Sequence, residues 1–318
     1  MKRWKWLLGT WGIISLLTGC VSFGRSSGPN LACLIPPAFD PGVGEFYFCD
    51  RPEGVQHLIA YARRSFNTAG EREDIWVHFQ GVFDHKVWIN IGEREANDTS
   101  FPVLDLLPEL IRQMQRIKAE DRDALQAFLA PLERTPARNA EEQAFKETLL
   151  NAIRASAVRP ADHEIQITLY HVHLKPTREI EERSLMPINH LLSLPSHTDL
   201  FYAHRIDAMV AGLGVKAEHR IAVPAGIWTY RWEETTAIRF VQTHYDGPSD
   251  VPEPLKYAHA YTKFAITKYH EFGLNDPSKI TPAQVRSYIE LLRQTGADLS
   301  FTFAADWEEF RTHHLLKP

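Results

Sequence analysis

Apolar and polar residues alternate from residue 164 to residue 170, which is the period of a half-buried β-strand. Side chains two positions apart project from the same face of a strand. The apolar row that contains Ile167 and Leu169 therefore continues into two histidines, His171 and His173. The pattern predicts a strand that ends with two imidazoles on one face.

A period of about 3.6 residues replaces this alternation between residues 104 and 157. Three successive apolar stripes predict three helices, which we interpret as an inserted helical layer. The other expected elements are a helix over 55–66, a hairpin of 75–83 and 87–91, a helix over 198–212, a hairpin over 219–230, a helix over 254–272, a helix that begins after Thr281, and a strand over 299–303. This order predicts an α/β (α+β) fold with a mixed sheet flanked by helices.

The composition is that of a globular protein, with 44% apolar and 24% charged residues in 318. The formal net charge is −5. A mildly acidic chain without a basic patch argues against nucleic acid as a partner.

The first twenty residues have the organisation of an export signal. Three cationic residues at positions 2, 3 and 5 precede a short apolar run over 7–17, and Leu17-Thr18-Gly19-Cys20 follows. This segment resembles a bacterial lipoprotein signal peptide with its lipobox. The resemblance implies cleavage after residue 19, lipid (palmitate) attachment at Cys20, and, because Val21 follows, anchoring in the outer membrane with the body in the periplasm. Removal of three positive charges would take the formal charge to −8.

Export changes the interpretation of the two remaining cysteines. Cys33 and Cys49 form an even pair in a compartment that permits disulfides. A bridge between them would close a loop of about 16 residues and contribute about 3 kcal/mol. We therefore expect residues 20–53 to form a lipidated tether and a disulfide-closed segment.

The two histidines have downstream partners in a fixed order. His171-Val172-His173 is followed by Ser196-His197-Thr198-Asp199, and then by a strand, a Pro/Gly turn and an aromatic strand. The H-x-H and S-x-x-D motifs resemble those of the JAMM (JAB/MPN) metalloprotease family over residues 54–232. The resemblance implies a cytidine-deaminase-like fold, zinc held by His171, His173 and Asp199, and Ser196 as oxyanion donor. It also implies a peptide or protein substrate.

The chain differs from the family at two places. Residues 174–195 separate the motifs and predict an insertion at the mouth of the site. The family places a general-base Glu three residues before a Gly, where this chain has His78 and Gly81. His78 is therefore one candidate base, and Glu73 and Asp74 upstream are the others.

Other interpretations remain open from the sequence. Hydrogen bonds alone could satisfy the two histidines, and an Asp199 near a helix N-terminus is stabilised by the helix dipole without metal. The chain could also be a catalytically inactive scaffold that binds an envelope partner, or an amidohydrolase of a barrel fold. Residues 233–318 predict a mainly helical C-terminal extension packed on the same body.

Overall fold

The computed structural model describes most of the chain after residue 50. The described residues are 33–34, 46–49, 51–65, 73–83, 87–94, 103–134, 136–137, 139–157, 164–173, 190–276, 278 and 280–314. The signal peptide, Cys20 and most of the expected insertion between the motifs lie outside them. No helix among the described residues combines the length and the apolar character that a membrane crossing requires.

A mixed sheet forms the centre of the molecule, as the sequence predicts. Its described strands follow the order β1-β2-β4-β3-β5-β6-β7-β8. Their bounds are β1 Cys33–Leu34, β2 Phe46–Cys49, β3 Glu73–Gln80, β4 Val87–Arg94, β5 Gln166–Val172, β6 Lys216–Val223, β7 Gly226–Trp232 and β8 Ala297–Phe303. Only β5 and β6 pair in parallel among these strands. A barrel of parallel strand–helix repeats is incompatible with this pairing.

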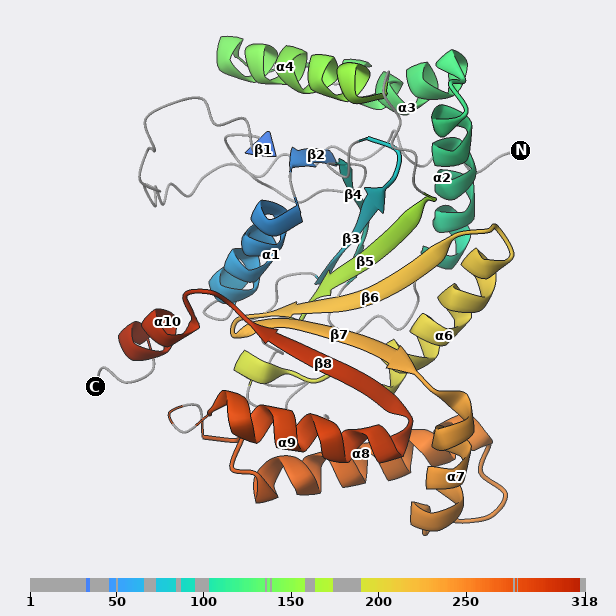
Figure 1. The fold of residues 1–318 in the computed structure, drawn as a ribbon, viewed down its shortest axis with the longest axis vertical. Coiled ribbons are helices and arrows are strands. Elements are labelled where there is room, and N and C mark those ends of the chain that lie inside the picture. Colours follow the sequence, from blue (N-terminus) through green and yellow to red (C-terminus); the bar gives the residue numbers. More distant parts are fainter. Residues whose placement is uncertain are drawn as a thin grey trace.

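The helices flank the sheet (Figure 1). Their bounds are α1 Arg51–Ser65, α2 Val103–Lys118, α3 Arg122–Arg134, α4 Ala140–Ala157, α6 His197–Ala211, α7 Glu234–His244, α8 Glu253–Glu271, α9 Pro282–Leu292 and α10 Trp307–His314, with short 3-10 turns η2 His190–Leu192 and η4 Arg293–Thr295. The three helices expected between residues 104 and 157 are confirmed as α2, α3 and α4. The sequence pattern did not predict α7 and α10.

The two faces of β5 contribute to different apolar clusters. Ile167 and Leu169 join the cluster that includes side chains of α2 and the later part of α6. Tyr170 and Val172 join a larger cluster that includes side chains of α1 and also Leu200 and Ala203 of α6. The helices α2 and α6 lie on one face of the sheet and α1 on the other (Figure 1). His171 belongs to the α6 face, because it continues the row of Leu169.

The sheet extends beyond residues 54–232 at both ends. Cys33 stands opposite Cys49 in the β1–β2 register, and Cys49 is disulfide-bonded. The C-terminal region adds a strand as well as helices, because β8 pairs with β7 along its whole length. The region after residue 232 therefore completes the sheet.

A glycine joins η4 to β8 in a conformation that other residues rarely adopt. Gly296 has φ +85°, and a Cβ there would lie 2.6 Å from the Ala237 nitrogen and 2.7 Å from the Glu233 oxygen. Gly214 has a similar φ of +70°, but a Cβ at that position would meet nothing within 4 Å. Gly296 is thus constrained by both backbone conformation and space.

We expect Gly296→Ala to lower the free energy of unfolding by about 2–3 kcal/mol, because strain and steric overlap add. Gly214→Ala, the matched control, should cost about 1 kcal/mol from backbone strain alone. Urea denaturation of both variants measures the difference. Equal losses would contradict the close packing of η4 against α7.

Candidate metal centre

The end of β5 places the two histidines. Ile75 of β3 and Ile221 of β6 flank His171 in register on its two sides. His173 lies just beyond the strand, and its backbone N–H still donates to the Ala222 carbonyl at 3.0 Å. The ladder to β6 therefore continues past β5 and keeps both imidazoles on one face.

The first turn of α6 places the carboxylate. Ser196 is the N-cap, and its Oγ accepts the Asp199 backbone N–H at 3.2 Å. Asp199 Oδ2 in turn accepts the Ser196 backbone N–H at 2.7 Å and its hydroxyl at 2.8 Å. This is a reciprocal capping box, in which Asp takes the place of the usual Glu. The S-x-x-D motif therefore fixes the rotamer of Asp199.

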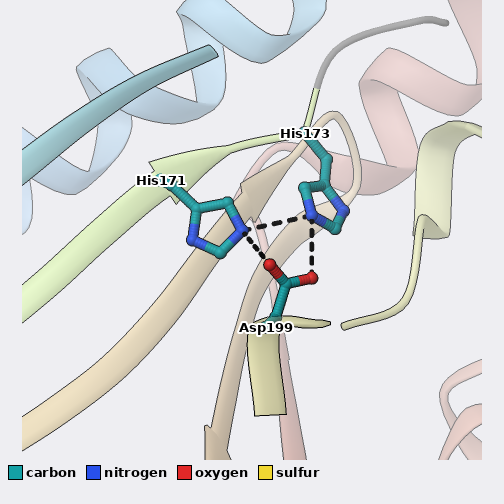
Figure 2. A group of neighbouring side chains, drawn as sticks. All are labelled: His171, His173 and Asp199. Atoms are coloured by element: carbon teal, nitrogen blue, oxygen red, sulfur yellow. Dashed lines mark hydrogen bonds and ion pairs between the residues drawn. The ribbon is translucent and has the colours of Figure 1, made fainter. Parts of the chain in front are cut away.

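The three expected ligands meet at one point (Figure 2). The Nε2 atoms of His171 and His173 are 3.1 Å apart. Asp199 Oδ1 lies 3.4 Å from His171 Nε2, and Asp199 Oδ2 lies 3.5 Å from His173 Nε2. One ligand atom from each residue lies within 4.8 Å of the others. The structure thus brings His171, His173 and Asp199 together as the sequence predicts.

The geometry and the chemistry of this group fit a metal ion. Donors at about 2.0–2.1 Å around a tetrahedral zinc stand about 3.3–3.4 Å apart. The two Nε2 atoms are 3.1 Å apart, and each lies 3.4 or 3.5 Å from a different oxygen of Asp199, which is close to this value. Two imidazoles and a carboxylate are also a common ligand set of open zinc sites. This buried group could therefore hold a metal ion.

The site is enclosed and electrostatically coupled. The side chains of His171, His173 and Asp199 are 6%, 12% and 2% exposed. Burial disfavours the charged carboxylate, but His171 and then His173 hold the pKa of Asp199 well below its usual range. Asp199 is therefore an anion that needs a cationic partner, which protonated histidine or a metal ion supplies.

Two neighbours that the sequence analysis did not assign to the site orient the imidazoles. Ser193 Oγ lies 3.1 Å from His173 Nδ1, so it can accept that N–H and leave Nε2 as the ligand atom. Tyr230 of β7 meets His171 edge-on, with ring centroids 6.2 Å apart. Tyr230 alternates with two tryptophans in the sequence, a pattern typical of core packing, and nothing in that pattern marks a contact with His171. Nothing in the sequence distinguishes Ser193.

The structure does not bring His78 to the site. His78 stands opposite Thr168, three residues from His171 along β5. An odd separation places it on the other face of the sheet, where its ring stacks on Trp88 with centroids 4.3 Å apart. His78 is fully buried there. The prediction of His78 as general base therefore finds no support in the geometry.

Glu73 occupies a different register position. It begins β3, two residues before Ile75, which stands opposite His171. In the pleat of β3, position 73 therefore falls on the same face as Ile75. The positions of Asp74 and His78 fall on the opposite face. The side chains of Glu73 and Asp74 lie outside the described residues.

A second capping box provides a control for the role of Ser196. Thr281 and Gln284 cap α9 with the same reciprocal hydrogen bonds, outside the candidate site. We expect Ser196→Ala and Thr281→Ala each to lower the free energy of unfolding by about 1 kcal/mol. Only Ser196→Ala should also weaken metal binding, because only that serine holds a ligand. Denaturation and metal titration of both variants test this, and unchanged metal affinity in Ser196→Ala would contradict the positioning role.

Comparisons with protein-family models, with curated proteins and with solved structures found no match to the chain. The interpretation of the site therefore depends on the residues and the geometry described above.

Proposed function

We propose that the chain is a lipid-anchored zinc hydrolase of the bacterial cell envelope, with a divergent JAMM-like site that cleaves amide bonds in peptides or proteins. The observation that supports this is the convergence of His171, His173 and Asp199 at distances suited to zinc. The order H-x-H then S-x-x-D agrees with the JAMM motifs. A mixed sheet flanked by helices is the coarse architecture that this family requires.

The residues of the chain have separate tasks in this proposal. When bound, zinc polarises a carbonyl and makes water more acidic near neutral pH. Ser193 fixes the tautomer of His173, and Ser196 fixes Asp199. Burial of all three ligands strengthens the electrostatic interactions among them. The Ser196 hydroxyl donates to Asp199, and its role as oxyanion donor would require it to turn toward the substrate.

We assign the general base to Glu73 rather than to His78. A base must reach the same side of the sheet as the ligands. Glu73 lies two residues before Ile75 on β3, and Ile75 stands opposite His171 in the register. His78 is separated from the ligands by the sheet itself.

The cellular location in this proposal comes from the N-terminal segment. The cationic start, the short apolar run and Cys20 support lipid anchoring in the outer membrane, with the body in the periplasm. A peptide or protein substrate of the envelope follows from that location. The disulfide at Cys49 agrees with an oxidising compartment.

An inactive binding lipoprotein is the alternative function. The observation that favours it is the position of His78 on the far face of the sheet. The group found among the described residues contains one carboxylate, that of Asp199, and it would be occupied as a ligand rather than free to act as a base. A scaffold of this kind would hold the metal and bind an envelope partner without hydrolysis.

We expect about one zinc per chain in the full-length protein and none in His173→Ala or Asp199→Ala, because two ligands cannot hold the ion tightly. His259→Ala is the matched control, since that half-exposed histidine faces Asp246 and does not belong to the His–His–Asp group, so zinc content should be unchanged. Elemental analysis after dialysis measures this. Absence of zinc in the wild type, at unchanged stability, would refute the metal site.

We expect Glu73→Gln to keep the zinc and to reduce hydrolysis of a quenched fluorescent peptide library by about 10²–10⁴-fold, the range for loss of a general base. Asp74→Asn is the matched control and should retain activity, because position 74 falls on the opposite face of the β3 pleat. Zinc-loaded protein that cleaves no peptide, in the wild type as in both variants, would favour the inactive scaffold.

A further inference from the structure

A buried tyrosine of the C-terminal region reaches the loop that precedes α6. The hydroxyl of Tyr261, on α8, donates a hydrogen bond to the Pro195 carbonyl at 2.8 Å, although the two residues are 66 positions apart in the chain. Tyr261 is fully buried, and Pro195 is buried as well. A buried carbonyl without a donor would destabilise the fold, so this bond satisfies the backbone of the loop.

One peptide group connects this hydrogen bond to the carboxylate of the candidate metal centre. The carbonyl of the Pro195–Ser196 peptide accepts from Tyr261, and the N–H of the same peptide donates to Asp199 Oδ2 at 2.7 Å. The peptide is trans, so it is planar and its C=O and N–H point in opposite directions. Tyr261 and Asp199 therefore hold one rigid group from its two sides.

The same loop also contacts a histidine ligand. Ser193 lies two residues before Pro195, and its Oγ is 3.1 Å from His173 Nδ1. Leu194 between them is buried in the same apolar cluster as Tyr261. The hydrogen bond from Tyr261 thus fixes the loop between the serine that faces His173 and the N–H that faces Asp199.

The surroundings of Tyr261 hold its ring in place and keep its hydroxyl protonated. The ring stacks on Tyr257, with centroids 5.6 Å apart and planes at 12°. Burial, followed by the neighbouring tyrosines and Asp199, raises the pKa of Tyr261 well above its usual value. The hydroxyl is therefore a permanent donor near neutral pH. A donor on the carbonyl side of a buried peptide also polarises its N–H toward the acceptor.

We propose that Tyr261 is a positioning residue for Asp199, which acts through the Pro195–Ser196 peptide and on which the affinity of the site for metal depends. In this account, the C-terminal region supports the candidate centre as well as completing the sheet. The inference rests on the metal site of the proposed function, and it assigns to Tyr261 no contact with substrate.

Tyr288 of α9 provides a matched control. It is also fully buried, and its hydroxyl donates to the Ala265 carbonyl at 2.9 Å, one turn beyond Tyr261 on the same helix α8. Tyr261→Phe and Tyr288→Phe each leave one buried carbonyl of the C-terminal half of the fold without its donor. Both variants should therefore shift the urea midpoint by similar amounts. Only the hydrogen bond of Tyr261 continues to a metal ligand.

Competition between the full-length protein in detergent and a chromophoric chelator measures the zinc affinity of each variant. We expect Tyr261→Phe to bind zinc about tenfold more weakly than the wild type, the lower end of the effects of residues that orient metal ligands. Tyr288→Phe should stay within about twofold of the wild type, because a structural loss alone does not displace Asp199. Equal zinc affinity in all three proteins overturns the proposal.

Hydrogen exchange at single-residue resolution tests the positioning without metal. In the zinc-free protein, Tyr261→Phe should exchange the Ser196 amide several-fold faster than the wild type, whereas Tyr288→Phe should not. The Thr281 amide is the internal reference, since it donates to Gln284 at 2.9 Å in the second capping box. Unchanged exchange at Ser196 in Tyr261→Phe overturns the proposal.

The two measurements separate this inference from the proposed function. If the wild type binds no zinc but the Ser196 amide depends on Tyr261, the metal site and the proposed hydrolysis fail, while the positioning of Asp199 stands. If the wild type binds zinc and Tyr261→Phe leaves its affinity unchanged, Tyr261 supports only the loop. In that case the inference fails and the metal site stands.

Discussion

The parallel pairing of β5 with β6 is the constraint on which the rest of the site depends. Two parallel neighbours need a crossover, and here the crossover contains α6. A crossover helix runs back along the sheet, so its N-terminus lies near the end of the first strand. The first turn of α6 is thereby brought to the two histidines at the end of β5. Ser196 and Asp199 meet His171 and His173 because of this connection.

The same arrangement buries the charge of Asp199, which its neighbours must stabilise. Asp199 is a nearly buried anion at the positive end of a helix, and two imidazoles face it. The capping box gives the carboxylate two hydrogen bonds from Ser196. These bonds stabilise the helix whether or not a metal binds. The 3.1 Å separation of the two Nε2 atoms suits either a hydrogen bond between the rings or a shared cation. Metal content therefore decides the role of the histidine pair.

Periodicity predicted much of the fold and placed the two histidines on one face of β5. The resemblance to the JAMM motifs, not periodicity, pointed to Asp199, and its S-x-x-D motif marks the start of α6. Local pattern did not reveal which face His78 would occupy, because that depends on its register against Thr168. The helix α7 was missed because Thr235, Thr236 and Ile238 are β-branched, and its packing of Phe240 and Val241 is tertiary.

X-ray absorption at the zinc edge tests the central claim most directly, because it reports the ligands of the ion itself. The zinc-loaded full-length chain should show nitrogen and oxygen donors at about 2.0–2.1 Å with the outer-shell scattering of two imidazoles. His171→Ala should lose one imidazole from that signal. A spectrum without imidazole scattering, or one that His171→Ala leaves unchanged, would contradict a metal centre at the end of β5.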